Sequence, residues 1–192
     1  MKHKFQKAIS MMLTLVVVLN TPTLAVGTQI QTENEVNYVY LESADHIPWD
    51  NIPANTAYVV PNDQTTSCLS GRTDSLQPRG MNPPTLEWNV AEDGTCSISG
   101  RDTNSAGPLY TQYKYYGAEE YRIVIRNNLP EDILYMTIHE VAFWSPYERE
   151  YSVPAGSTLY CFIESQAGFT TSTRWYMYFE CPCNVSGSIL EN

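Results

Sequence analysis

Tyr121-Arg122-Ile123-Val124-Ile125-Arg126 has the side-chain alternation of a half-buried β-strand. Successive side chains of an extended chain point to opposite faces, so Ile123 and Ile125 share one face and the two arginines share the other. The segment predicts a strand with one face toward a hydrophobic core.

Similar strand-forming runs occur on both sides of this segment along the chain. Aromatic and β-branched residues are concentrated in short runs at 36–41, 57–60, 85–90, 96–99, 134–138, 158–163 and 174–179. Turn-forming residues separate these runs, as in Val153-Pro154-Ala155-Gly156-Ser157, and no segment has a sustained helical period. The sequence therefore predicts an all-β protein of short strands, as in sandwiches and barrels.

Two halves of the chain match when one is shifted along the other. The shift is 93 positions at first (139 − 46) and 87 further on (175 − 88). Self-similarity at a nearly constant spacing predicts two copies of one structural unit. The aligned pairs include His46 with His139, Tyr58 with Tyr151, Cys68 with Cys161, Trp88 with Trp175, Cys96 with Cys183 and Ser99 with Ser186.

We therefore expect two homologous β-sandwich-like repeats, residues 26–105 and 121–192, joined by a tyrosine-rich connector at 106–120. The second repeat is expected to hold about six short strands. The repeats form either two small tandem domains or one sandwich with a pseudo-twofold axis and a shared core. The connector is either a linker or an extra strand, and its tyrosines favour an ordered segment packed on the repeats.

Residues 1–25 have the pattern of a secretory signal peptide. Lys2, Lys4 and Lys7 precede an uncharged apolar run at 11–19, and a candidate cleavage site follows at Ala25. The run is shorter than the roughly 20 residues that a membrane-spanning helix needs, so a membrane anchor is the weaker interpretation. We expect a secreted, extracellular protein.

The chain is acidic, with 11 basic and 21 acidic residues. Removal of the three lysines of the signal peptide would leave 8 basic residues against 21 acidic ones, a formal charge of −13. Nucleic-acid binding depends on basic surface, and anionic lipid head groups repel a protein of this charge. Nucleic acid and direct membrane binding are therefore not expected, and the acidity itself is typical of solubility outside the cell.

Five cysteines in an exported chain indicate an oxidising compartment, and the odd number leaves at least one without an intramolecular partner. The repeat favours the bridges Cys68–Cys96 and Cys161–Cys183, with Cys181 as the free thiol. A Cys161–Cys181 bridge is the alternative, because only one residue separates Cys181 from Cys183.

The matched histidines and tryptophans are the candidate binding residues. For His46 and His139 a structural role, such as closing a turn, is the simpler interpretation, because a catalytic or metal role needs partners. Trp88 and Trp175 each lie eight residues before a cysteine, which is typical of core packing in β-sandwiches. The alternative for the tryptophans is stacking on a sugar ring.

No catalytic residue, metal site or cofactor is predicted. Paired acids such as Glu131-Asp132 and Glu148-Arg149-Glu150 are expected at solvated edges and turns. Sequence neighbours on a strand point to opposite faces, whereas glycoside hydrolysis needs two carboxylates that face each other. His139-Glu140 lacks the second histidine of a zinc-protease helix, and the serine-nucleophile and phosphate-loop motifs are missing from the sequence.

The signal-peptide pattern and the turn at 153–158, followed by an aromatic strand, resemble small exported bacterial β-sandwich proteins in general character, chiefly over the second repeat. This likeness assigns no site residues. We expect a secreted, non-catalytic binding or surface-interaction protein that recognises carbohydrate or a cell-surface partner, because two copies of a weak site gain avidity. The alternatives are a secreted hydrolase with a site at the interface of the repeats, near His46 and His139, and an inhibitor or toxin-like effector with an exposed loop at 64–84.

Overall fold

The alternating segment that starts at Tyr121 forms the central strand of a seven-stranded sheet, here called sheet A. This strand, β9 (Tyr121–Asn127), pairs antiparallel with two neighbours, β12 (Ser157–Ile163) and β14 (Cys183–Glu191). β2 (Thr56–Pro61) extends the sheet beyond β12, and β6 (Cys96–Asp102) extends it beyond β14. Two parallel edge strands complete it, β1 (Asn37–Tyr40) beside β2 and β3 (Arg72–Ser75) beside β6.

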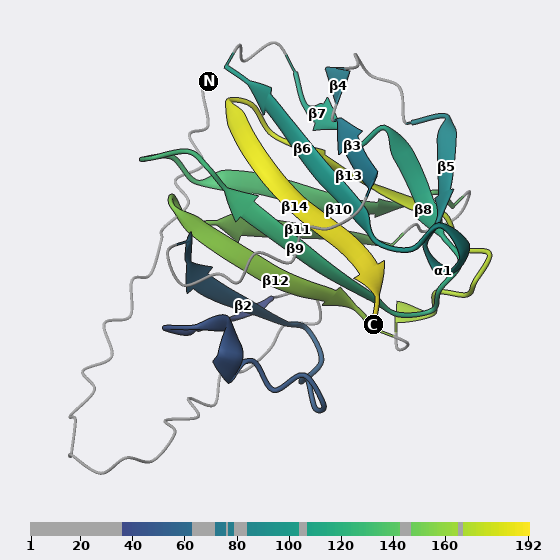
Figure 1. Ribbon diagram of the computed structural model, residues 1–192, viewed down its shortest axis with the longest axis horizontal. Coiled ribbons are helices and arrows are strands. Elements are labelled where there is room, and N and C mark those ends of the chain that lie inside the picture. The colour runs from purple at the N-terminus through teal and green to yellow at the C-terminus, as the bar shows by residue number, and fades with distance from the viewer. Residues whose placement is uncertain are drawn as a thin grey trace, which may run out of the picture. The chain divides into compact units, whose positions relative to one another are not determined.

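A second sheet of seven strands, sheet B, lies behind the first (Figure 1). Its main path runs in the order β11-β10-β13-β7-β4, and β8 joins β5 to β13. Its strands are β4 (Gln77–Pro78), β5 (Leu86–Asn89), β7 (Leu109–Tyr110), β8 (Tyr113–Tyr116), β10 (Leu134–Glu140), β11 (Glu148–Val153) and β13 (Trp175–Phe179). The computed structural model describes residues 36–62, 72–75, 77–78, 84–103, 107–142, 147–164 and 167–192, all within one compact unit at 32–192.

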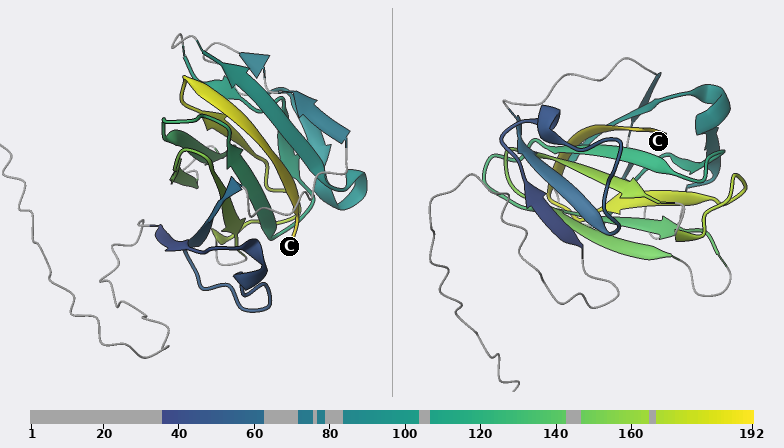
Figure 2. Two further views of the ribbon diagram at one scale, coloured as in Figure 1. Left: turned by 60° about the vertical axis from the view of Figure 1, so that its left-hand side comes forward. Right: turned by 90° about the horizontal axis from the view of Figure 1, so that it is seen from below.

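The core lies between the two sheets, whose layering is visible in Figures 1 and 2. As the alternation predicts, Ile123 and Ile125 are fully buried from sheet A. Sheet B contributes Trp175, Met177 and Phe179, which are also fully buried. The all-β class is therefore confirmed, and the helices α1 (Val90–Asp93) and η1 (Ala44–His46, a 3-10 helix) are each a single short turn. The described residues include no helix with the length and apolarity needed to cross a bilayer.

A smaller apolar cluster covers part of the outer face of sheet A. Tyr58 and Phe162 point away from the main core, and residues of the segment 41–55 pack over them. The indole of Trp49 contacts Phe162 edge-on at 6.2 Å between ring centroids, and the Arg122 guanidinium lies 4.0 Å from the centre of the same indole. The segment 41–55 therefore covers part of the outer face of sheet A.

Buried Asn127 organises the turn between β9 and β10. Its side chain has no exposed surface, and its Nδ2 donates hydrogen bonds to the carbonyls of Asp132, Val153 and Pro154. Its Oδ1 accepts one from the amide of Leu129 at 2.9 Å. A buried amide needs such partners, and here they connect sheet A with the end of β11 in sheet B.

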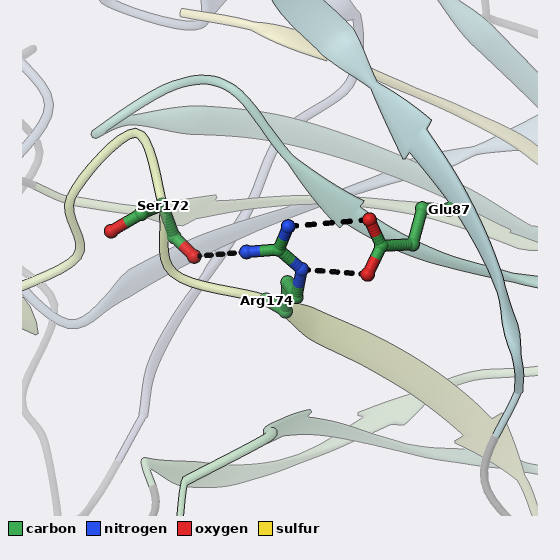
Figure 3. A network of polar contacts seen from close by, with 3 residues as sticks. All are labelled: Glu87, Ser172 and Arg174. Carbon is green, nitrogen blue, oxygen red and sulfur yellow. Dashed lines mark hydrogen bonds and ion pairs between the residues drawn. The ribbon is translucent and has the colours of Figure 1, made fainter.

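An ion pair connects β5 with the start of β13 (Figure 3). Arg174 Nε and Nη2 donate to the two carboxylate oxygens of Glu87 at 2.7 and 3.2 Å, and Nη1 donates to the carbonyl of Ser172 at 2.8 Å. The same guanidinium lies 4.7 Å from the ring centre of Tyr116 in β8. The contacts therefore hold β5, β8 and β13 in register at one end of sheet B.

The structure does not confirm the predicted repeat. The matched histidines occupy different structures, since His46 ends η1 and His139 lies in β10. Likewise Tyr58 lies in sheet A and its predicted counterpart Tyr151 in sheet B. Of the aligned residues, Ser99 in β6 and Ser186 in β14 lie directly opposite each other where these two strands pair. The predicted signal peptide lies outside the described residues.

The predicted bridge between Cys161 and Cys183 is wrong, because both cysteines have free thiols. β12 and β14 flank β9 on opposite sides, and Cys161 pairs with Ile123. Val185 pairs with Asn127, so Cys183 lies past that end of β9, about 20 Å along the strand from the level of Cys161. A disulfide needs α-carbons within about 7 Å.

The first predicted bridge cannot be placed in full. Cys96 is buried in β6, while its predicted partner Cys68 lies outside the described residues. Cys181, predicted to be the free thiol, has a free thiol 3.7 Å from the sulfur of Cys183. The alternative partner, Cys161, also has a free thiol, so no Cys161–Cys181 bridge is present.

Candidate functional site

Sheet B has an outer face of aromatic side chains. In β13 the alternation that buries Trp175, Met177 and Phe179 directs Tyr176 and Tyr178 to the opposite side. In β10, Tyr135, Thr137 and His139 alternate with buried Met136 and Ile138. We call the outward set of Tyr110, Tyr135, Tyr176, Tyr178 and His139 the tyrosine face; Tyr135 is exposed, Tyr176 is only 6 % exposed, and the other three are partly exposed.

Strand register brings these side chains together. His139 pairs with Tyr176 across β10 and β13, and their ring centroids are 5.1 Å apart. Tyr178 pairs with Tyr110 of β7 at 5.6 Å between centroids, and Tyr110 lies 6.0 Å from Tyr176. The four rings come from three hydrogen-bonded strands, so the platform is held by the rigid part of the fold.

Carboxylates border the tyrosine face on the side of the edge strand β11. Glu148 pairs with His139, and its Oε1 lies 3.5 Å from His139 Nδ1. The same oxygen accepts a hydrogen bond from the Tyr178 hydroxyl at 3.3 Å. Glu150, the next outward residue of β11, pairs with Thr137. The face therefore offers aromatic rings beside hydrogen-bond acceptors.

The phenols of Tyr176 and Tyr178 stay protonated at physiological pH. Burial raises the pKa of Tyr176 to about 12, and the neighbouring Tyr110, Tyr178 and Glu148 add to the shift. Burial also raises the pKa of Tyr178. Neutral phenols can donate hydrogen bonds as well as present their ring faces.

A cavity of about 470 Å³ opens at one end of the tyrosine face. Tyr135 of β10 belongs to the face and lines the cavity, as does Glu180, which follows β13 and donates its amide to the Tyr135 carbonyl at 3.0 Å. Tyr135 and Ile133 are each 49 % exposed, which is high for large apolar side chains. The other lining residues are Glu131, Asp132, Cys181 and Pro182. The cavity thus joins exposed apolar surface to three carboxylates.

A second cavity, of about 280 Å³, lies beside Trp49 over sheet A. Two carboxylates that line it already accept hydrogen bonds, Glu164 Oε1 from the Asn55 amide at 2.9 Å and Glu120 Oε2 from Asn192 Nδ2 at 3.3 Å. The Trp49 ring is covered by Arg122. These groups fasten the segment 41–55 to the sheet, which makes the tyrosine face the stronger candidate site.

The two predicted tryptophans lie in the core. Trp175 is fully buried between Tyr115 and Tyr121, each 5.0 Å away between centroids. Trp88 is 3 % exposed and donates from Nε1 to the carbonyl of Gly94 at 3.0 Å. Neither ring can stack on a ligand in this position, so the structure agrees with core packing and not with the predicted binding role.

The two predicted histidines do not converge. His46 is exposed in η1, which packs over the outer face of sheet A, whereas His139 belongs to the outer face of sheet B. The sandwich core lies between them, so they share no cleft. Among the described residues, no group of three or more His, Cys, Asp or Glu side chains is arranged to hold a metal ion.

His139 is the predicted residue that the structure places at the candidate site. The sequence carries a signal for its aromatic neighbours, because Tyr176 and Tyr178 are separated by one residue as outward positions of a strand must be. The contribution of Tyr110 depends on the pairing of β7 with β13, which no local pattern reveals. No protein-family model matches the chain, and no curated protein matches it.

Proposed function

We propose that this protein is a secreted, non-catalytic binding protein whose tyrosine face recognises carbohydrate. The observation that supports this function is the pair of partly exposed, outward rings of Tyr110 and Tyr178 on adjacent strands, with the buried ring of Tyr176 packed beside Tyr110. Aromatic faces pack against the apolar C–H face of a sugar ring, while nearby polar groups hydrogen-bond its hydroxyls. Glu148 and Glu150 supply acceptors at the border of the platform.

The ligand we expect is a neutral polysaccharide. Glu148, Glu150 and Glu180 border the face, and the chain as a whole has a formal charge of −10. An anionic sugar would be repelled by this field, whereas neutral hydroxyl groups donate hydrogen bonds to carboxylates. Extended strands also give a flat surface, which suits a chain of sugar units better than a single one.

Binding of the full-length protein to a polysaccharide array, followed by titration calorimetry, tests this function. Tyr178→Ala should lower the affinity for the bound polysaccharide about tenfold or more, because it removes one ring of the platform. Tyr40→Ala is the matched control, since Tyr40 is 68 % exposed on β1 of the other sheet. Absence of binding to every neutral polysaccharide, or an equal loss in both variants, would contradict the proposal.

A cell-surface partner with a basic patch is the second candidate. The acidic cavity beside Tyr135 favours it, because three carboxylates line that cavity together with exposed apolar surface. Binding to such a partner should weaken strongly as the salt concentration rises. Binding to a neutral polysaccharide should change little over the same range.

The hydrolase at the interface of the repeats stays an alternative proposal, although the two histidines offered for it lie on opposite faces. Release of reducing ends from a bound polysaccharide would support it. The duplication is likewise a proposal, supported by the β6–β14 pair, in which the matched residues Ser99 and Ser186 lie directly opposite each other. An experimental structure in which the chain paths of 26–105 and 121–192 do not superpose would exclude it.

A further inference from the structure

Two cysteine sulfurs meet where the chain passes from β13 to β14. Cys181 Sγ and Cys183 Sγ are 3.7 Å apart, and only Pro182 separates the two residues. Both are free thiols. A disulfide bond is about 2.05 Å long, so a small side-chain movement would bring the sulfurs into bonding distance.

The two thiols differ in access. Cys183 is fully buried at the start of β14, while Cys181 is partly exposed and lines the cavity of about 470 Å³ beside Tyr135. A small molecule that enters this cavity reaches Cys181 first. Cys183 then lies directly behind it, within reach of the same sulfur atom.

We propose that Cys181 and Cys183 form a reversible dithiol–disulfide site that reacts with low-molecular-weight disulfides. The Cys181 thiolate attacks the small disulfide, forms a mixed disulfide and expels one small thiol. The Cys183 thiolate then attacks Cys181 Sγ, forms the internal bridge and expels the second small thiol. In total, two protein thiols lose two electrons and two protons, and the small disulfide is reduced to two thiols.

The bridge is reversible because it closes a very short ring. With one residue between the cysteines, the chain cannot relax freely to the preferred disulfide geometry, and strained bridges are the more easily reduced ones. Burial raises the pKa of Cys181 and raises that of Cys183 to about 12. Both thiols are therefore protonated at neutral pH, and the reaction should accelerate as the pH rises.

Peptide mapping of the folded full-length protein after exposure to oxidised glutathione tests the site. The wild type should contain a Cys181–Cys183 bridge and no glutathione on either of these two cysteines. Cys183→Ser should retain glutathione on Cys181, because the resolving thiol is missing. Cys181→Ser should leave Cys183 unmodified, since Cys183 is buried. Cys161, fully buried in β12, serves as the unreactive internal control.

Three results would overturn the proposal: an unmodified Cys181 in Cys183→Ser, glutathione retained on Cys181 of the wild type, or a bridge from either cysteine to Cys161 or Cys68. If Cys183→Ser does not fold, alkylation of the native wild type decides the matter. Cys181 should be alkylated before oxidation and protected after it. Equal alkylation before and after oxidation means that no bridge forms.

Discussion

At the scale of the single residue, Asn127 is a buried polar side chain whose hydrogen bonds connect sheet A with sheet B. It is fully buried, and its amide makes four hydrogen bonds to backbone groups around the β9–β10 turn and the end of β11. Asn127→Ala leaves the buried carbonyl of Val153 without this donor and removes three partly buried hydrogen bonds, at about 1 kcal/mol each. We expect a loss of about 3 kcal/mol in the free energy of unfolding, measured by urea denaturation.

The neighbouring asparagine provides the control for this prediction. Asn128 is exposed and makes one side-chain hydrogen bond, from Nδ2 to Ser186 Oγ at 3.2 Å. Asn128→Ala should change the free energy of unfolding by less than about 1 kcal/mol. Similar losses in the two variants would show that burial of Asn127 does not control the stability of the turn.

The pairing of Glu87 with Arg174 should give a pH-dependent contribution to stability. Hydrogen bonds from Arg174 lower the pKa of Glu87 below its ordinary value of 4.5. The pair therefore stabilises the fold above about pH 4.5, and this contribution is lost as the pH falls through the lowered folded-state pKa. The effect is small because both side chains are more than a third exposed.

The carboxyl signal of Glu87 in an NMR titration measures this effect directly. Arg174→Gln should move the midpoint of Glu87 upward and weaken the acid dependence of stability. Arg126→Gln, at an exposed position of β9, should leave the midpoint unchanged. A Glu87 midpoint that is the same in the wild type and in Arg174→Gln would rule out the ion pair.

The identity of the candidate site residues was the least predictable feature at this scale. Trp175 and Tyr176 are neighbours in a run with almost no polar residue, so the alternation has two possible phases. Only pairing with β10 and β8 settles that Trp175 points to the core and Tyr176 outward. The sequence analysis favoured the tryptophans, whereas the partly exposed rings of sheet B are those of Tyr110 and Tyr178.

At the scale of the element, strand positions were predictable wherever aromatic and β-branched residues cluster. The predicted runs at 121–126 and 158–163 fall within β9 and β12. β11 was missed because Glu148-Arg149-Glu150 looks like a solvated turn. It is an edge strand whose Arg149 points inward to bind Asn55 Oδ1, and an inward charge of this kind discourages pairing with another chain.

The close pairing of β14 with β9 requires a glycine at position 187. Gly187 lies between Ile125 of β9 and Ile98 of β6, and a methyl group at this position would overlap the carbonyl oxygen of Val124. The strand is paired on both sides, so it cannot move away from β9 without straining its pairing with β6.

We therefore expect Gly187→Ala to lower the free energy of unfolding by about 2–3 kcal/mol, as overpacking in a core does. Ser186→Ala changes the preceding residue, whose side chain is on the outer face, and should cost less than about 1 kcal/mol. Urea denaturation of both variants makes the comparison. Equal stability of Gly187→Ala and the wild type would show that β9 and β14 separate without cost.

At the scale of the whole molecule, the predicted repeats do not divide the sandwich evenly. The described strands of residues 121–192 are the six from β9 to β14, which form the centre of sheet A and most of the main path of sheet B. Strands of residues 26–105 lie at both ends of sheet A, with β12, β9 and β14 between β2 and β6. A linear alignment could not reveal this, because it says nothing about which strands pair.

This arrangement predicts that the halves of the chain behave differently when separated. A fragment of residues 26–105 keeps the pairs β1–β2 and β3–β6 but has no strand to join them, so it should be unfolded. A fragment of residues 121–192 keeps six strands around one core and should retain β-structure, with lower stability, because β12 and β14 become open edges. Circular dichroism and NMR dispersion of each fragment test this. A well-dispersed spectrum from residues 26–105 alone would establish tandem domains in place of the shared sandwich.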